Sequence, residues 1–196
     1  VGILNRIDFD IDEVGLPIPF QWGKCKLATV SFGHGITTTP LQLAKGYSII
    51  SNGGYDIKPT LILKKGKDET EKKKIIEKDV SIKINNMLRK IVTSDNGTAG
   101  LANISGYEVG GKTGTAQKVI DGKYSRLKIN TFASIFPSSN PDFVLVVLID
   151  EPKTSEDYIY KYRNKAGSYK GTPFNTAGWT SVEIVGNIID KIGPIL

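Results

Sequence analysis

Gly110-Gly111-Lys112-Thr113-Gly114-Thr115-Ala116-Gln117 lies within the first of three strands that the sequence predicts, over residues 107–118, 131–136 and 143–149. The second and third strands flank the turn-forming run Pro-Ser-Ser-Asn-Pro, which predicts a hairpin. The third strand is apolar throughout, without polar alternation, so we expect both of its faces to be covered. The stretch around Lys112 is therefore expected at one side of a small sheet.

Three helices are predicted around these strands. The first begins after Thr39, where Pro40 and Gln42 complete a capping box, and it ends at Gly53-Gly54. The second should run over 79–93, and the third should begin at about Thr176. The apolar faces predicted for the three helices, in order, are Leu43, Tyr47 and Ile50; Val80, Ile84, Met87 and Ile91; and Val182, Val185, Ile189 and Ile192.

The order of these elements predicts an α+β fold in which an antiparallel sheet is flanked by helices. Residues 1–28, broken by glycines and prolines, are expected to be irregular, and 59–63 to form a further short strand. Asp95-Asn96-Gly97 should form a turn after the second helix.

Composition excludes several classes of function. The net charge is +6, but the densest lysine run, over 64–78, also contains four acidic residues, so we predict a solvated loop and no nucleic-acid partner. The longest apolar run, over 143–149, is too short to span a membrane. Cys25 and His34 are the only residues of their kinds, so neither a disulfide within the chain nor a metal site is predicted, and no cofactor is expected. Cys25 is interpreted as a buried or half-buried small residue.

The residues from Gly110 to Gln117 suit acyl transfer. Lys112 supplies a positive charge for a carboxylate or for tuning a nearby serine. Thr113 and Thr115 are two residues apart, so their hydroxyls should share one face of the strand. Gly114 leaves room for close approach of a substrate, and an edge N–H such as that of Thr115 can serve as one arm of an oxyanion hole. The alternative is a glycine-weakened edge strand with an exposed lysine.

The wider sequence resembles the class B penicillin-binding transpeptidases, division-type members in particular. Lys112-Thr113-Gly114 matches the third motif of that family, whose first two motifs are Ser-x-x-Lys and Ser-x-Asn. The resemblance extends in order along the whole chain. Its other segments are Ala28-Thr-Val-Ser-Phe-Gly-His-Gly-Ile36, Thr39-Pro-Leu-Gln-Leu-Ala44, Asn52-Gly-Gly54, Thr131-Phe-Ala-Ser-Ile-Phe-Pro137 through Ile149-Asp-Glu-Pro152, and Thr176-Ala-Gly-Trp179.

This resemblance implies a penicillin-binding, peptidoglycan-crosslinking serine D,D-transpeptidase of septal wall synthesis, anchored in the inner membrane and facing the periplasm. It implies that Lys112 and Thr115 are catalytic, the latter through its oxyanion-hole N–H, and that Thr113, Gly114 and Thr115 bind the substrate. The implied partners are stem peptides, β-lactams and membrane proteins of the division complex. An elongation-type transpeptidase, a D,D-carboxypeptidase and a non-catalytic penicillin-sensing domain remain alternatives.

The family's first two motifs are expected upstream of this sequence, so residues 1–196 are predicted to be the C-terminal part of a transpeptidase domain and inactive alone. Three short runs imitate the missing motifs: Ser94-Asp95-Asn96, Ser125-Arg-Leu-Lys128 and Ser138-Ser139-Asn140. All three are predicted in turns or loops. Thr115-Ala-Gln-Lys118 has a similar spacing, but it lies on a strand, where Thr115 and Lys118 face opposite sides and cannot pair. No serine hydroxyl is therefore expected within hydrogen-bond reach of the Lys112 ammonium.

Overall fold

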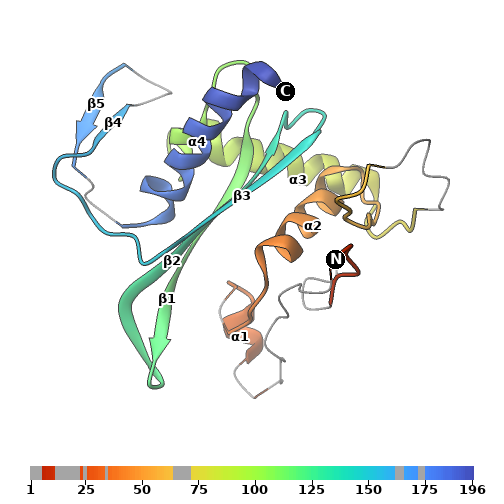
Figure 1. The fold of residues 1–196 in the computed structure, drawn as a ribbon, viewed down its shortest axis with the longest axis horizontal. Helices are drawn as coiled ribbons and strands as arrows, with labels where there is room; N and C mark the ends of the chain where they lie inside the picture. Colours follow the sequence, from red (N-terminus) through yellow and green to blue (C-terminus); the bar gives the residue numbers. More distant parts are fainter. Residues whose placement is uncertain are drawn as a thin grey trace.

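The computed structural model describes residues 6–11, 23, 26–33, 35–63, 72–161, 166–171 and 175–196. Its elements follow the predicted α+β order (Figure 1): α1 (Lys26–Val30), α2 (Pro40–Ser51), α3 (Lys78–Thr93), η1 (Gly100–Ala102), β1 (Gly110–Ile120), β2 (Lys123–Phe136), β3 (Phe143–Asp150), β4 (Ile159–Lys161), β5 (Ser168–Lys170), η2 (Ala177–Trp179), α4 (Ser181–Ile192) and η3 (Gly193–Ile195).

The sheet that carries Lys112 is antiparallel, as predicted, and its strand order is β1-β2-β3. Lys112 lies opposite Ala133 on β2, and Phe132 lies opposite Val147 on β3. Strands β1 and β2 form a hairpin that was not predicted, which closes through Asp121 and Gly122, with φ angles of 50° and 74°. Because β3 begins to pair with β2 only at Ile129, the end of this hairpin projects beyond the sheet (Figure 1).

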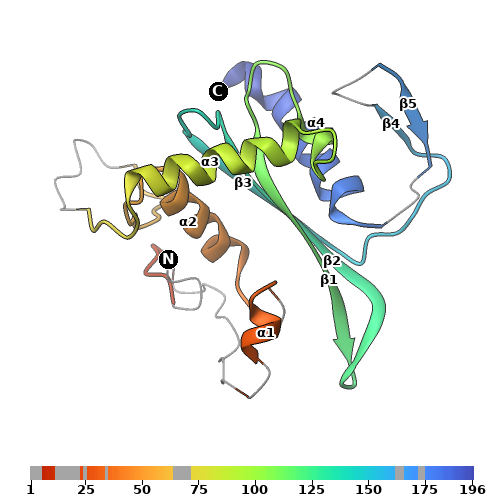
Figure 2. The same ribbon diagram turned by 180° about the vertical axis from the view of Figure 1, so that it is seen from behind.

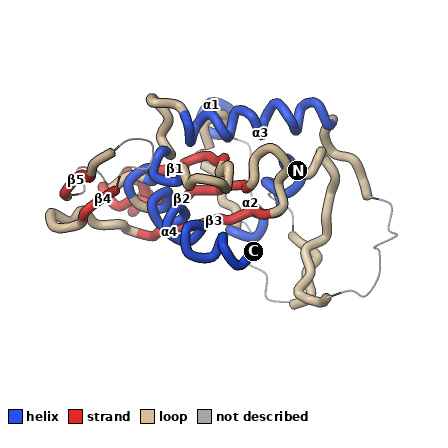
Figure 3. Tube along the Cα trace, turned by 90° about the horizontal axis from the view of Figure 1, so that it is seen from above, coloured by secondary structure: helices blue, strands red, loops and turns tan. Residues whose placement is uncertain are grey.

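Helices cover the sheet on both faces and along one edge. Both α2 and α4 contact β2 and β3, and Figure 1 shows them on opposite sides of the strands. Helix α3 contacts β1; it crosses the start of that strand at an angle in the view from behind (Figure 2) and lies alongside it in the view from above (Figure 3). The predicted arrangement of a sheet flanked by helices is confirmed.

Helix α4 packs on the sheet through the apolar face that the sequence predicts. Val182, Val185 and Ile189 are fully buried in a cluster with Phe132 and Phe136 of β2. Ile192, at the end of the helix, remains 36% exposed. A 3-10 turn, η2, comes between Thr176 and this helix, so α4 begins later than predicted.

The capping box of α2 is present as predicted. The Thr39 hydroxyl accepts a hydrogen bond from the Gln42 N–H at 3.2 Å, and the Gln42 side chain accepts one from the Thr39 N–H at 2.9 Å. Leu43, Tyr47 and Ile50 are only half-buried, whereas Gln42, Gly46 and Ile49 form the buried face. Burial raises the pKa of Tyr47 to about 12.

The buried face of α3 differs from the prediction. Val80 and Met87 of the predicted apolar stripe are 40% and 62% exposed, and the helix instead buries Ser81, Asn85, Leu88 and Val92. Ser81 donates to the carbonyl of Ile50, and the Asn85 amide donates to that of Ser51 at 3.3 Å. These carbonyls belong to the last turn of α2, where a helix lacks internal donors. Ser81 and Asn85 are therefore buried because they donate hydrogen bonds to carbonyls at the end of α2.

Three further predictions about the elements are wrong. Residues 59–63 form an exposed loop and not a strand, and the Asp10 carboxylate accepts hydrogen bonds from Thr60 and Leu61. Strand β3 is not covered on both faces throughout, because Leu148 is 47% exposed. Helix α1 begins within the stretch that was predicted to be irregular. The short hairpin of β4 and β5, in the tyrosine-rich stretch, was not predicted.

Cys25, His34 and part of the lysine-rich run, residues 64–71, lie outside the described residues, as does most of 1–25. Among the helices that the structure describes, none is long and apolar enough to cross a membrane.

Candidate active site

Strand β1 is held at the edge of the described sheet by close packing and by one arginine. The Arg89 guanidinium of α3 donates to the carbonyl of Val109 at 2.7 Å and to the Asn103 side chain at 3.1 Å. A Cβ on Gly110 would lie 3.0 Å from the backbone nitrogen of Arg89, so the strand packs directly against the backbone of α3. Burial lowers the pKa of Arg89. These contacts hold the start of β1, just before Lys112, in place against α3.

Thr113 and Thr115 project from the same face of β1, as their spacing predicts. Their cross-strand neighbours are Phe132 and Asn130, on the side that α4 covers. The Thr113 hydroxyl lies 3.0 Å from the Thr98 hydroxyl, and the Thr115 hydroxyl accepts a hydrogen bond from the Ala177 N–H at 3.0 Å. Two segments distant in sequence therefore meet the two threonines.

Lys112 lies between the glycines and the threonines, and its side chain leaves the opposite face of the strand. The side chain is exposed, and its ammonium donates a hydrogen bond to the carbonyl of Thr113 at 2.8 Å. The ammonium charge is thus held beside the strand edge at the position of the threonines. A fixed cation there can meet an anion or a nucleophile that approaches this edge.

The glycines of β1 differ in what this chain requires of them. A Cβ on Gly111 would lie 2.6 Å from the Phe132 ring and 2.7 Å from the carbonyl oxygen of Ala133, so that position must be glycine for packing. A Cβ on Gly114 would meet nothing closer than Thr131, at 3.9 Å. Nothing within the described residues therefore requires a glycine at position 114.

A cavity of about 530 Å³ opens on the face that carries the two threonines. Its walls come from β1, from the turn after α3 and from η2. The residues that line it are Asp95, Gly97, Thr98, Gly100, Leu101, Thr113, Thr115, Thr176, Gly178 and Trp179. The cavity thus combines hydroxyl groups with an apolar wall, which suits a small organic ligand that carries a polar group.

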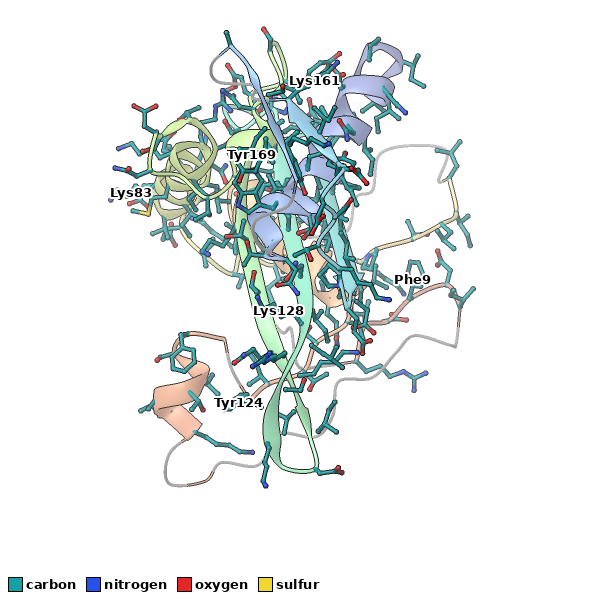
Figure 4. The ribbon with its side chains drawn as sticks, turned by 90° about the vertical axis from the view of Figure 1, so that its left-hand side faces the viewer. Phe9, Lys83, Tyr124, Lys128, Lys161 and Tyr169 are labelled. Carbon is teal, nitrogen blue, oxygen red and sulfur yellow. The ribbon has the colours of Figure 1, made fainter. Side chains whose placement is uncertain are left out.

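The segment from Asn175 to Thr180 is tied to the sheet behind the cavity. The buried Asn130 amide, opposite Thr115, donates to the Asn175 carbonyl at 3.0 Å and to the Thr180 hydroxyl at 2.8 Å. Asn175 accepts a further hydrogen bond from Lys128 at 2.7 Å. Figure 4 shows Lys128 on the long hairpin.

Aromatic side chains support the same segment from the β4-β5 hairpin. The Tyr160 hydroxyl donates to the carbonyl of Trp179 at 2.7 Å, and the two rings meet edge to face at 5.0 Å. Tyr169, labelled in Figure 4, lies 5.6 Å from Trp179 between ring centres. Burial, followed by the charge of Glu183, raises the pKa of Tyr160 to about 12. The phenol therefore remains a hydrogen-bond donor at neutral pH.

The runs that imitate the missing motifs do not assemble a nucleophile. The structure describes every serine of the sequence, and within it the Lys112 ammonium is hydrogen-bonded to the Thr113 carbonyl and to no serine hydroxyl. Ser94 ends α3, and Ser125 accepts from the Leu127 N–H in the hairpin. The side chain of Ser139 donates to Glu108. The prediction that no serine lies within reach of Lys112 is confirmed.

Two groups that contact the threonines, Thr98 and the backbone of Ala177, were not predicted from the sequence. Thr98 closely follows Ser94-Asp95-Asn96, a run that imitates a family motif. Ala177 belongs to Thr176-Ala-Gly-Trp179, which resembles the family but carries no predicted role. The available signal was Gly178, since a Cβ there would lie 2.7 Å from the Thr98 carbonyl oxygen and a close approach of this kind favours glycine.

The model of the family described as the penicillin-binding protein transpeptidase domain matches residues 1–172. The chain belongs to this family. The probable peptidoglycan D,D-transpeptidase FtsI of Caulobacter vibrioides is 28% identical over 100% of this chain and 33% of its own length. The probable peptidoglycan D,D-transpeptidase PenA of Neisseria gonorrhoeae is 32% identical over 95% of this chain and 31% of its own length. The chain thus spans about a third of these transpeptidases, and the resemblance to class B members is confirmed.

Solved structures of penicillin-binding proteins share the fold. The apo transpeptidase domain of Burkholderia pseudomallei penicillin-binding protein 3 superposes with a TM-score of 0.78 at 24% identity, over 99% of this chain and 54% of that chain. Penicillin-binding protein 3 from Mycobacterium tuberculosis, complexed with aztreonam, gives a TM-score of 0.74 at 24% identity, over 98% of this chain and 44% of that chain. The penicillin-binding transpeptidase fold predicted from the sequence is thereby confirmed.

Proposed function

We propose that residues 1–196 form the C-terminal part of the transpeptidase domain of a peptidoglycan D,D-transpeptidase that acts in septal wall synthesis. The observation that carries this proposal is the cavity beside β1, onto which the Thr113 and Thr115 hydroxyls open. Lys112 lies on the same strand, at an edge that carries no serine of this chain. The chain then supplies one wall of the active site, and the nucleophile comes from the upstream part of the protein.

In this proposal the upstream serine attacks the carbonyl of a D-alanyl-D-alanine bond, releases the terminal D-alanine and forms an acyl-enzyme. The amine of a second stem peptide then attacks the ester, which forms the crosslink and frees the serine. A β-lactam acylates the same serine, and its ring nitrogen is the leaving group that remains attached. The positive charge of Lys112 stabilises the substrate carboxylate and favours ionisation of the upstream serine.

The two threonine hydroxyls would donate to the carboxylate that a stem peptide and a penicillin share. The N–H of Thr115 would act as one arm of the oxyanion hole, on which charge develops as the serine attacks. Gly114 would let the substrate lie against the strand, because a Cβ there would meet nothing among the described residues closer than Thr131, at 3.9 Å. The glycine is thus required by the ligand and not by the fold.

The proposed partners are the peptidoglycan stem peptides, β-lactams and the upstream part of the same domain. The named relatives are peptidoglycan transpeptidases of the FtsI and PenA types. By analogy we place the full-length protein at the periplasmic face of the inner membrane, with the membrane proteins of the division complex. No cofactor enters the proposed reaction, which requires a serine, a lysine and hydrogen-bond donors.

Labelling with fluorescent penicillin tests the proposal. The full-length protein should form a covalent adduct that survives denaturing electrophoresis, and residues 1–196 alone should not, because no described serine meets Lys112. Preincubation with unlabelled penicillin is the control for specific labelling. A stable adduct on residues 1–196 would contradict the proposal and would direct attention to Ser94 and Ser125.

Removal of the Lys112 ammonium should slow acylation in the full-length protein. We expect Lys112→Ala to lower the second-order rate constant for penicillin by at least ~10²-fold, a typical loss for one electrostatic or proton-transfer group. Lys118→Ala is the matched control, since the Lys118 ammonium pairs with Asp150 and Glu151 instead. An unchanged rate in Lys112→Ala would remove this lysine from the site.

A further inference from the structure

The two cavity threonines are each hydrogen-bonded from behind by another part of the chain. The Ala177 N–H donates to the Thr115 hydroxyl at 3.0 Å. Because a backbone N–H can only donate, this bond uses the Thr115 oxygen as an acceptor and leaves the hydroxyl hydrogen available to a ligand. The Thr113 hydroxyl has its neighbour at the same distance, 3.0 Å, in the Thr98 hydroxyl, and in that pair either oxygen can be the donor.

We propose that Thr98 is a positioning residue for the substrate carboxylate, which it affects through Thr113. When Thr98 donates to Thr113, the Thr113 hydrogen is directed away from Thr98 and into the cavity. Thr98 then donates to Thr113, and Thr113 donates to the carboxylate. The first hydrogen bond polarises the Thr113 hydroxyl and so strengthens the second. Thr98 would thus do for Thr113 what the Ala177 N–H does for Thr115. This inference rests on the proposed function, in which the two threonines bind a carboxylate.

The surroundings of Thr98 suit that role because they fix its position. The turn that holds it is closed by the Gly97 N–H, which donates to the Ser94 carbonyl at 2.8 Å. A Cβ on Gly97 would lie 2.2 Å from the Ile91 carbonyl oxygen, so the turn packs directly on the end of α3. On its other side, Gly178 lies against the Thr98 carbonyl. Backbone contacts on both sides therefore aim the Thr98 hydroxyl at Thr113.

The test compares the binding of a penicillin and of its methyl ester to the full-length protein. The kinetics are analysed so that the dissociation constant of the noncovalent complex is obtained separately from the acylation rate constant. Thr98→Val keeps the shape of the side chain and removes the donor. We expect it to weaken binding of the acid about tenfold, because Thr113 loses the hydrogen bond that directs its hydroxyl toward the carboxylate, and to change binding of the ester by less than about twofold. Thr98→Ser should retain the acid preference, and Thr93→Val, at the exposed end of α3, is the matched control.

The outcomes separate the inference from the proposed function. If Thr98→Val weakens acid and ester equally, or neither, the positioning role is overturned. If Thr113→Val also leaves the acid preference intact, the carboxylate is not bound here and the proposed function itself fails. Thermal unfolding of each variant reports on folding. Should Thr98→Val fold poorly, Thr98→Cys carries only a weak donor and must lose the acid preference for the inference to stand.

Discussion

At the scale of single residues, the fold requires one glycine of β1, and in the proposed function the ligand requires another. Gly111 packs against the Phe132 ring and the Ala133 carbonyl, whereas a Cβ on Gly114 would meet nothing among the described residues closer than Thr131, at 3.9 Å. Both glycines belong to one glycine-rich run, and the sequence singles out Gly114 for substrate approach but gives no sign that packing requires Gly111. The distinction depends on which neighbours the opposing strand brings to each position.

Substitution of these two glycines should therefore have opposite consequences. Gly111→Ala should lower the melting temperature, because the added methyl would lie 2.7 Å from a backbone oxygen that cannot turn away. Gly114→Ala should leave the melting temperature unchanged within about 2 °C. It should slow acylation by penicillin, because the methyl occupies the approach to the strand. Differential scanning calorimetry and the acylation rate distinguish the two, and a marked loss of stability in Gly114→Ala would refute the assignment.

At the scale of elements, α3 explains why one buried face could not be predicted. Its sequence offers an apolar stripe through Val80 and Met87, yet Ser81 and Asn85 are buried because they donate to the last carbonyls of α2. Apolar periodicity identifies a buried face when the neighbour is apolar. It cannot identify one whose neighbour is the end of another helix. In α4 the neighbour is the sheet, and there the apolar pattern predicts Val182, Val185 and Ile189 correctly.

Two adjacent residues of α3, Met87 and Leu88, test which face of this helix is buried. Leu88 is 7% exposed and Met87 is 62% exposed, although both are large and apolar. Leu88→Ala should reduce the free energy of unfolding by about 2–5 kcal/mol, the range for truncation of a buried leucine. Met87→Ala should cost less than about 0.5 kcal/mol, as for most surface substitutions. Urea denaturation followed by circular dichroism measures both. Equal losses would mean that Met87 is covered in the intact protein.

At the scale of the whole molecule, the site depends on parts of the chain that the sequence separates widely. The three strands of the Lys112 sheet and the glycine-threonine run can be predicted because apolar runs, turn residues and the period of two act locally. The contacts of Thr113 and Thr115 cannot, since Thr98 and Ala177 reach them through the turn after α3 and the segment before α4. Only the fold brings these segments to one cavity.

Asn130 is the residue through which this long-range assembly can be tested. Its side chain is fully buried on β2, opposite Thr115, and its amide donates to Asn175 at 3.0 Å and to Thr180 at 2.8 Å. Asn130→Ala would leave both partly buried acceptors without this donor, which should cost about 1–3 kcal/mol of unfolding free energy. It should also loosen the segment that places the Ala177 N–H on Thr115.

Amide hydrogen exchange measures that loosening directly. In Asn130→Ala we expect faster exchange for peptides that cover residues 175–182, and unchanged exchange for peptides from α2, on the far side of the sheet. Asn140→Ala, at an exposed position in the β2-β3 loop, is the matched control and should match the wild-type protein in both regions. Penicillin acylation should slow in the first variant and not in the second, because Thr115 loses its fixed donor. If Asn130→Ala destabilises the protein while exchange over 175–182 stays at the control value, the coupling between β2 and the C-terminal segment does not run through this amide.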